Sequence, residues 1–108
     1  MLHDGLGVKI RVQMKGADVI NKLSRTFTVL GDPTRVRIIF ALSISELCVS
    51  EISAALNMTH SAVSHQMRAL RDLNLVKCRK AGRRVYYLLN DKHIENLFEE
   101  GLRHVTEK

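Results

Sequence analysis

Tryptophan is absent from this sequence of 108 residues, proline occurs once, and aromatic residues make up only 5% of the chain. Because large rings are scarce while hydrophobic residues reach 45%, the core must be built from Leu, Ile and Val side chains. One proline and six glycines leave room for long helices and argue against an all-β fold. A chain of this length forms one domain with a modest core. We therefore expect a mainly α-helical (α+β) domain.

Cysteine is also scarce, and the two thiols, Cys48 and Cys78, match no zinc-knuckle or CxxC pattern. Residues 1–16 lack the apolar stretch of a signal peptide. No segment approaches the roughly 18 consecutive apolar residues that a membrane span requires. These absences predict a cytoplasmic protein with reduced thiols and no membrane partner.

Catalytic motifs are missing as well. The sequence contains no GxSxG, no phosphate-binding loop and no HExxH, and a domain this small is not expected to hold a substrate cleft. His60 and His65 are five residues apart and poorly placed to share one metal ion. We therefore expect no enzymatic activity and no small-molecule substrate.

Positive charge is plentiful and unevenly distributed. The net charge is +6 and the pI is about 9.8, which makes a polyanion a plausible partner. Seven basic residues and a single acid, Asp72, lie between Arg68 and Arg84, whereas residues 91–108 carry five acids and three bases. A basic run is often only a solvated surface, so charge alone leaves both interpretations open.

Hydrophobic periodicity divides the chain into an arm and a helical domain. Residues 1–16 carry three of the six glycines without helical periodicity, which predicts a flexible N-terminal arm before a folded domain over residues 17–108. Apolar residues then recur at helical spacing from Val19 to Leu30, and Gly31 ends this helix. Asp32 and Pro33 supply the N-cap and first position of a second helix. Its predicted buried face consists of Val36, Ile39, Phe40 and residues 42–44.

Two more helices, two strands and a final helix follow. Ser50 can cap a short helix with Ile52, Ala55 and Leu56 inside, and Thr59 or His60 opens a longer one. The inward residues of the longer helix are Val63, Met67, Leu70 and Leu73. The apolar period then changes to two, which predicts strands at 75–79 and 84–89 around a hairpin tip at 80–83. Asn90 and Asp91 precede a last helix from Lys92 to about Thr106. The sequence thus predicts about five helices and a two-stranded β-hairpin.

A short helix, a tight turn and a longer helix form the pattern of a helix-turn-helix, whose second helix enters the major groove of DNA. The outward residues of that helix are small, polar or basic, and no acid occurs from residue 59 to residue 71. Such side chains can bond base edges or phosphates, and the basic hairpin suits the DNA backbone. The predicted DNA-binding residues are His60, Ser61, Ser64, His65, Arg68, Lys80, Arg83 and Arg84.

Four segments together resemble the ArsR/SmtB family of metal-sensing repressors, over about residues 17–108. The segments are Leu30-Gly31-Asp32-Pro33-Thr34-Arg35, Glu46-Leu47-Cys48-Val49, Ser61-Ala62-Val63-Ser64-His65-Gln66 and Gly82-Arg83-Arg84-Val85-Tyr86-Tyr87. The resemblance implies a winged helix-turn-helix homodimer, paired through its first and last helices. It also implies repression of metal-resistance genes and weaker binding to double-stranded operator DNA when metal is bound.

The last helix carries four good ligands for a divalent metal: Asp91, His93, His104 and Glu107. His93 and His104 are eleven residues apart, so they share a face but lie roughly 16 Å apart along one helix. In an antiparallel homodimer, His93 meets His104 of the partner and Asp91 meets the partner's Glu107. Two N2O2 sites would result, a composition suited to Zn(II) or Co(II). The family's Asp-x-His and His-x-x-Glu pattern is reproduced here, and the resemblance therefore favours a metal site over the alternative of four solvated polar residues.

A second metal site of related cadmium and lead sensors is incomplete here. Glu46-Leu47-Cys48-Val49-Ser50 keeps one thiol of a Cys-Val-Cys pattern, and the arm has none. Cys48 and Glu51, with His3 or Asp4 of the other subunit, are candidates for a mixed site, but a lone cysteine is more often a small core residue. Two alternatives stay open: a winged-helix repressor that senses redox or a thiophilic metal through Cys48, and an architectural DNA-binding protein without a ligand.

Overall fold

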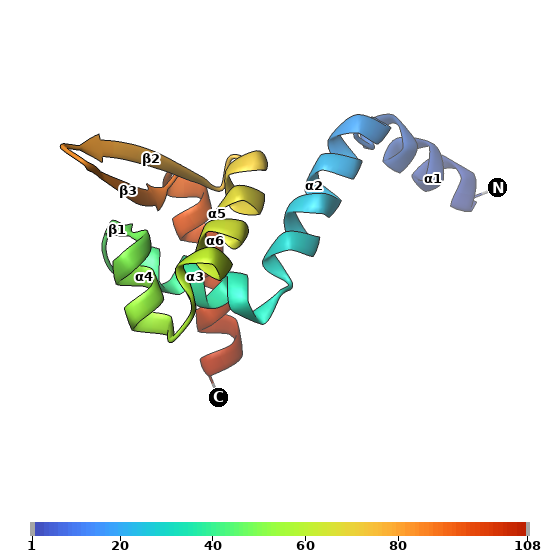
Figure 1. The fold of residues 1–108 in the computed structure, drawn as a ribbon. Helices are drawn as coiled ribbons and strands as arrows, with labels where there is room; N and C mark the ends of the chain where they lie inside the picture. The colour runs from blue at the N-terminus through green and yellow to red at the C-terminus, as the bar shows by residue number, and fades with distance from the viewer. Residues whose placement is uncertain (1, 108) are drawn as a thin grey trace.

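The computed structural model describes residues 2–107, with the side chains of residues 5–107. The described residues form six helices and a three-stranded antiparallel sheet (Figure 1). In chain order the elements are α1 (Leu2–Gln13), α2 (Ala17–Leu30), α3 (Pro33–Ile44), β1 (Leu47–Cys48), α4 (Val49–Leu56), α5 (His60–Asp72), β2 (Val76–Ala81), β3 (Arg84–Leu89) and α6 (Lys92–Thr106).

The N-terminal segment contains a helix that its lack of helical periodicity did not predict. Helix α1 projects beyond the far end of α2, away from the rest of the molecule (Figure 1). From residue 5 onwards, the large apolar side chains of α1 are exposed, Val8 and Ile10 among them. Residues 14–16 separate it from α2, which begins at Ala17, the residue where we expected the folded domain to begin. The extra helix raises the expected five helices to six.

Helix α3 begins where its capping residues predict and buries a different face from the one we expected. The Asp32 carboxylate accepts a hydrogen bond from the Arg35 N–H at 3.1 Å, and Pro33 occupies the first turn. The buried residues are Ile38, Ile39 and Leu42. The prediction was wrong for Val36, Phe40 and Ile44, which are exposed. The apolar residues of α3 nearly encircle it, so their spacing did not single out one face.

Helices α4 and α5 form the predicted helix-turn-helix. Asn57 ends α4 in the left-handed conformation, with φ of 55°, and the Thr59 hydroxyl accepts a hydrogen bond from the Ala62 N–H at 3.0 Å. The predicted Ser50 cap is wrong, because α4 begins at Val49 and its N-cap is Cys48. Ala55, expected inside, is exposed.

The sheet has the order β1-β3-β2, so the predicted hairpin gains a short third strand. Leu47 and Cys48 pair with Tyr87 and Tyr86, and β2 pairs with β3 from Val76–Leu89 to Ala81–Arg84. The hairpin loop is therefore only Gly82 and Arg83, with a φ of 63° at the glycine, which a two-residue loop of this kind favours. Strand β1 has two residues, too few for an alternating pattern to be seen in the sequence.

The core is made of aliphatic side chains from α3, α4, α5 and the start of β2, as the scarcity of aromatic residues predicted. Ile38, Ile52, Val63 and Leu70 are fully buried within it. Helices α2 and α6 contribute no buried residue. Their apolar sides instead border a groove of about 370 Å³, lined by Phe27, Leu30, Leu97, Phe98, Leu102 and Val105 among others. This chain therefore leaves an apolar surface on α2 and α6 uncovered.

Among the described residues, no helix is both long enough and apolar enough to cross a membrane. Cys48 and Cys78 are free thiols. They lie on β1 and β2, on opposite sides of β3. Two strand spacings separate their backbones by roughly 9.5 Å, beyond the roughly 7 Å limit for a disulfide.

Candidate nucleic-acid interface and metal-ligand positions

Helix α5 turns one face to the core and the other to solvent. Val63, Met67 and Leu70 are buried, and this fixes the helix against α3 and α4. The five predicted reading residues all lie on the exposed side: His60, Ser61, Ser64, His65 and Arg68. No acidic residue occurs before Asp72 in α5, so this surface presents hydroxyls, imidazoles and a guanidinium.

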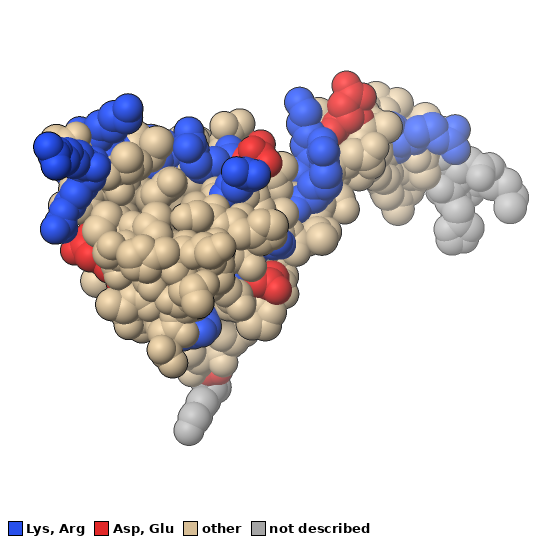
Figure 2. All heavy atoms as spheres, in the orientation of Figure 1, with Lys and Arg blue, Asp and Glu red and all other residues tan. Residues whose placement is uncertain are grey.

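The hairpin of β2 and β3 carries the second group of predicted residues. Lys80, Arg83 and Arg84 are exposed at and beside its loop, and Figure 2 shows Lys and Arg gathered at the free end of the hairpin. Among the described residues, Lys80 and Arg83 have no acidic partner. Cations placed on a projecting ribbon can reach phosphates on either side of a DNA groove.

One cation of the hairpin is used to hold it in place. Arg79 forms an ion pair with Glu46, in the loop before β1, and its guanidinium lies 5.1 Å from the centre of the Tyr86 ring. The hydrogen bond to Glu46 raises the pKa of Arg79. Arg79 was not among the predicted DNA-binding residues, and its pairing with Glu46 indicates a role in positioning the hairpin.

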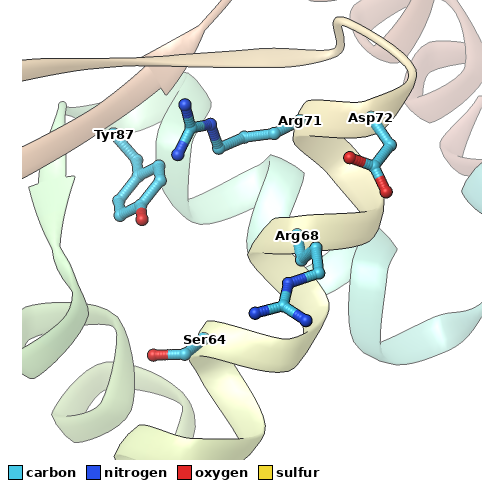
Figure 3. Close-up of a pocket in the computed structure, with 5 residues that line it drawn as sticks. All are labelled: Ser64, Arg68, Arg71, Asp72 and Tyr87. Atoms are coloured by element: carbon cyan, nitrogen blue, oxygen red, sulfur yellow. The ribbon is translucent and has the colours of Figure 1, made fainter.

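A pocket of about 380 Å³ lies between α5 and the sheet. It is lined by Ser64, Arg68, Arg71, Asp72 and Tyr87. Figure 3 shows the Arg71 and Ser64 side chains reaching from α5 towards Tyr87, while the Asp72 carboxylate lies on the other side of the helix. Sequence reasoning included Ser64 and Arg68 but missed Arg71 and Tyr87. The spacing of 64, 68 and 71 places three residues on one helical face and was the available signal for Arg71.

A side-chain hydrogen bond connects α5 to the first turn of α3. The Arg35 Nε donates to the Gln66 Oε1 at 2.8 Å, and both residues are partly buried. This bond joins residues 31 positions apart, so local sequence patterns could not have predicted it. It fixes the rotation of the middle of α5 relative to α3.

The first two predicted metal ligands lie together at the start of α6. Asp91 is the N-cap of the helix, and its Oδ1 accepts a hydrogen bond from the Ile94 N–H at 3.2 Å. The same oxygen lies 3.4 Å from the His93 Nδ1. Both side chains are exposed, so an oxygen and a nitrogen donor are available side by side.

The other two predicted ligands lie at the opposite end of α6. His104 is in the last turn, and Glu107 follows the helix with its carboxylate 4.0 Å from the Arg103 Nε. Among the described residues, no group of three or more His, Cys, Asp or Glu side chains within the chain is placed to hold a metal. Each end of α6 therefore carries two of the four predicted ligands, and the described part of the chain does not bring all four together.

Cys48 and Glu51 lie together at the start of α4. The Cys48 N–H donates to the Glu51 Oε1 at 2.9 Å, and this hydrogen bond lowers the pKa of Glu51. The Cys48 side chain is buried and Glu51 is exposed. This arrangement caps the helix and fills the core. The side chains of His3 and Asp4, predicted as further ligands of a second site, lie outside the described residues.

The sequence matches known bacterial regulators. The family described as "Bacterial regulatory protein, arsR family" matches residues 32–77, which cover α3, β1, α4, α5 and the start of β2. The chain is 41% identical over 99 residues to the "Transcriptional repressor SmtB homolog" of Synechocystis, covering 92% of this chain and 75% of that protein. It is 37% identical over 86 residues to the "Cadmium resistance transcriptional regulatory protein CadC homolog" of Staphylococcus aureus, covering 79% and 71%.

Solved structures show the same fold. The solution structure of apo-NmtR, a name carried by a Mycobacterium tuberculosis transcriptional regulator, aligns with a TM-score of 0.72 and 35% identity, covering 84% of this chain and 76% of that one. A homodimeric winged helix-turn-helix DNA-binding domain from Mycobacterium bovis aligns with a TM-score of 0.78 and 26% identity, covering 85% and 90%. The predicted winged helix-turn-helix is thereby confirmed.

Proposed function

Because this chain belongs to the ArsR family of bacterial regulatory proteins, we propose that it is a metal-responsive transcriptional repressor. A homodimer binds operator DNA and is released when Zn(II), or Co(II), binds at the C-terminal helices. The observation that carries the proposal is the exposed, acid-poor face of α5 beside a basic hairpin, in a chain closely similar to a transcriptional repressor.

DNA binding follows from the positions of the two exposed groups. The serine and histidine residues predicted on α5 are short enough for the helix backbone to approach the base edges in a major groove, where both residue types can hydrogen-bond. The cations of the hairpin contact the phosphates alongside, which contributes affinity without reading sequence. Arg68 lies between these two groups and is placed for either contact.

Pairing of two chains is supported by the apolar groove between α2, α3 and α6. Leu97 and Leu102 are each 40% exposed and Val105 is 75% exposed in the single chain. Side chains of this kind on neighbouring helices are stabilised by burial at about 25 cal/mol per Å² of apolar surface. A second copy of the same surface would cover them, as a two-fold axis requires. In the proposal α6 packs antiparallel against α6 of the partner subunit.

The metal site in this proposal is shared between the subunits. Asp91 and His93 of one chain supply one oxygen and one nitrogen, and His104 and Glu107 of the other supply the same pair. This donor set suits tetrahedral Zn(II), and Co(II) accepts the same ligands. The separation of the two pairs along one helix supports a bridging site, because neither pair alone provides four ligands.

The decisive measurement is metal-dependent release of DNA. We expect the metal-free protein to bind a labelled duplex from upstream of its own gene, and Zn(II) or Co(II) to weaken that binding roughly 5- to 150-fold, the usual range of allosteric coupling. Fluorescence anisotropy with a chelator control measures both affinities. Unchanged binding in the presence of Zn(II) contradicts metal regulation. A response to oxidant alone favours sensing through a thiol, and indifference to both favours an architectural protein.

A further inference from the structure

The pocket between α5 and the sheet is lined mainly by polar and charged side chains that are not part of the hydrophobic core. Two guanidinium groups, Arg68 and Arg71, line it together with the hydroxyl groups of Ser64 and Tyr87. Among the described residues, neither arginine forms an ion pair, although Asp72 is one residue from Arg71. Both arginines are exposed, so their charge is available to a ligand.

We propose that this pocket binds one phosphate group of the DNA backbone, with Arg71 and Tyr87 as contact residues in addition to Ser64 and Arg68. The inference rests on the DNA-binding function proposed above and specifies a contact that the exposed face of α5 does not by itself indicate. Two guanidinium groups and two hydroxyl groups supply hydrogen-bond donors suited to an oxyanion. Guanidinium groups pair with phosphate oxygens through parallel N–H bonds.

The position of the pocket favours a backbone phosphate. Ser64 and Arg68 lie on the same face of α5 as the neighbouring reading residues, and Arg71 continues that face towards the end of the helix. Tyr87 belongs to β3, the strand that continues from the basic hairpin loop. A DNA strand that passes between the reading helix and the hairpin therefore crosses this pocket. In Figure 3 the Arg71 guanidinium spans the space between α5 and Tyr87.

Asp72 opposes this charge but does not cancel it. It is the only acid among the lining residues, so the two arginines leave the pocket with an excess positive charge. Its carboxylate lies on the side of α5 away from Tyr87 (Figure 3). The anion is therefore expected on the Tyr87 side, between Arg71 and Ser64.

Arg71→Ala tests this assignment, with Lys22→Ala as a control that removes the same charge from an exposed position on α2. Loss of a charge-assisted phosphate contact is expected to weaken binding about tenfold or more. Arg71→Ala should weaken binding to the upstream duplex and to a random duplex by the same factor. It should also reduce the slope of log affinity against log salt by about one. Lys22→Ala should change neither. Arg71→Lys should restore only part of the affinity, because an ammonium group lacks the paired donors.

Tyr87→Phe removes one hydroxyl and keeps the ring that packs on the core. It should weaken binding to both duplexes several-fold, and circular dichroism should show that the variant is folded. Equal affinities and salt slopes for Arg71→Ala and Lys22→Ala overturn the inference while leaving the repressor proposal intact. Failure of the unaltered protein to bind any duplex overturns both. Titration with inorganic phosphate separates the two sources of anion: saturation at millimolar phosphate that Arg71→Ala abolishes, with unchanged DNA binding, assigns the pocket to free phosphate and contradicts the backbone contact.

Discussion

At Cys48 the backbone N–H takes part in the capping of α4, and the side chain is buried beside the core. The N–H is bonded to the Glu51 carboxylate at the start of α4, and the thiol side is buried beside the core. The position also pairs with Tyr86 in the sheet. A thiol held in this way contributes to stability, and its burial limits access by an oxidant or a thiophilic metal.

Glu51→Gln is expected to change how stability depends on acid. The hydrogen bond from Cys48 lowers the pKa of Glu51 from its ordinary value of 4.5, so the folded state favours the carboxylate. That contribution is present above pH 4.5 and is lost as the pH falls through the lower folded value. The glutamine variant keeps an acceptor but cannot titrate, so its free energy of unfolding should fall less steeply below pH 4.5. Urea unfolding between pH 3 and pH 7 measures this, and parallel profiles for the two proteins contradict it.

Substitutions on the exposed face of α5 should reduce discrimination between operator and random DNA without unfolding the protein. Ser64→Ala combined with His65→Ala should lower affinity for the operator more than for random DNA. The exposed His65 side chain is proposed to contact base edges, whereas the proposed phosphate contact of Ser64 is lost on both duplexes. Arg83→Ala should instead weaken binding to operator and random DNA by the same factor and reduce the salt dependence of binding. Anisotropy titrations at several salt concentrations separate the two patterns. Unchanged operator binding by the double variant, with the dimer intact, contradicts the assignment of the recognition helix.

Helices with a clear capping residue and an amphipathic pattern could be predicted from the sequence. For α4 and β1, the differences from the prediction come from contacts that the structure shows. The bounds of α6 are those expected from Asp91 and its periodic apolar residues. Helix α4 begins two residues earlier than a Ser50 cap implied, because Cys48 is held by Glu51. Strand β1 exists through its pairing with β3, a tertiary contact that no local pattern contains. The pocket residues Arg71 and Tyr87 come together for the same reason.

The hydrogen bond between Arg35 and Gln66 predicts that α5 depends on α3 for its orientation. Gln66→Ala should lower the free energy of unfolding by about 1 kcal/mol, since it leaves a partly buried guanidinium without its acceptor. Operator affinity should fall as well, although Gln66 does not face the DNA. Gln66→Glu keeps an acceptor for Arg35 and should preserve both properties. Urea unfolding and anisotropy measure the two effects, and wild-type behaviour of Gln66→Ala contradicts the proposed positioning role.

For the molecule as a whole, the uncovered groove predicts that a substitution in it can block dimer formation without unfolding the chain. Leu102 is 40% exposed in the single chain, so Leu102→Glu should leave the core intact but place charges at the surface that we propose pairs in the dimer. Analytical ultracentrifugation should show monomers with an unchanged circular dichroism spectrum. Ile44→Glu is the control, because Ile44 is 73% exposed and lies outside the lining of the groove. A dimeric Leu102→Glu protein contradicts pairing through this groove.

The metal site proposed to be shared between subunits makes the sharpest prediction for the assembled molecule. One subunit carries Asp91→Ser and His93→Ala, and the other carries His104→Ala and Glu107→Ala. Serine replaces Asp91 because that carboxylate also caps α6, and serine keeps a capping oxygen. A bridging arrangement leaves the mixed dimer with one complete set of four ligands and one set with none.

We therefore expect one tight Zn(II) per mixed dimer, two per unaltered dimer, and none in either variant homodimer. Two affinity tags allow purification of the mixed species, and competition with a chromogenic chelator counts the bound metal. The homodimers are the essential control, because each retains half of every site and shows what two ligands alone can hold. If the ligands of a site came from one chain, the mixed dimer would have no complete set. A mixed dimer without a tight Zn(II) would therefore show that these ligands are not shared across the interface, and would remove the physical basis proposed for metal-dependent release of DNA.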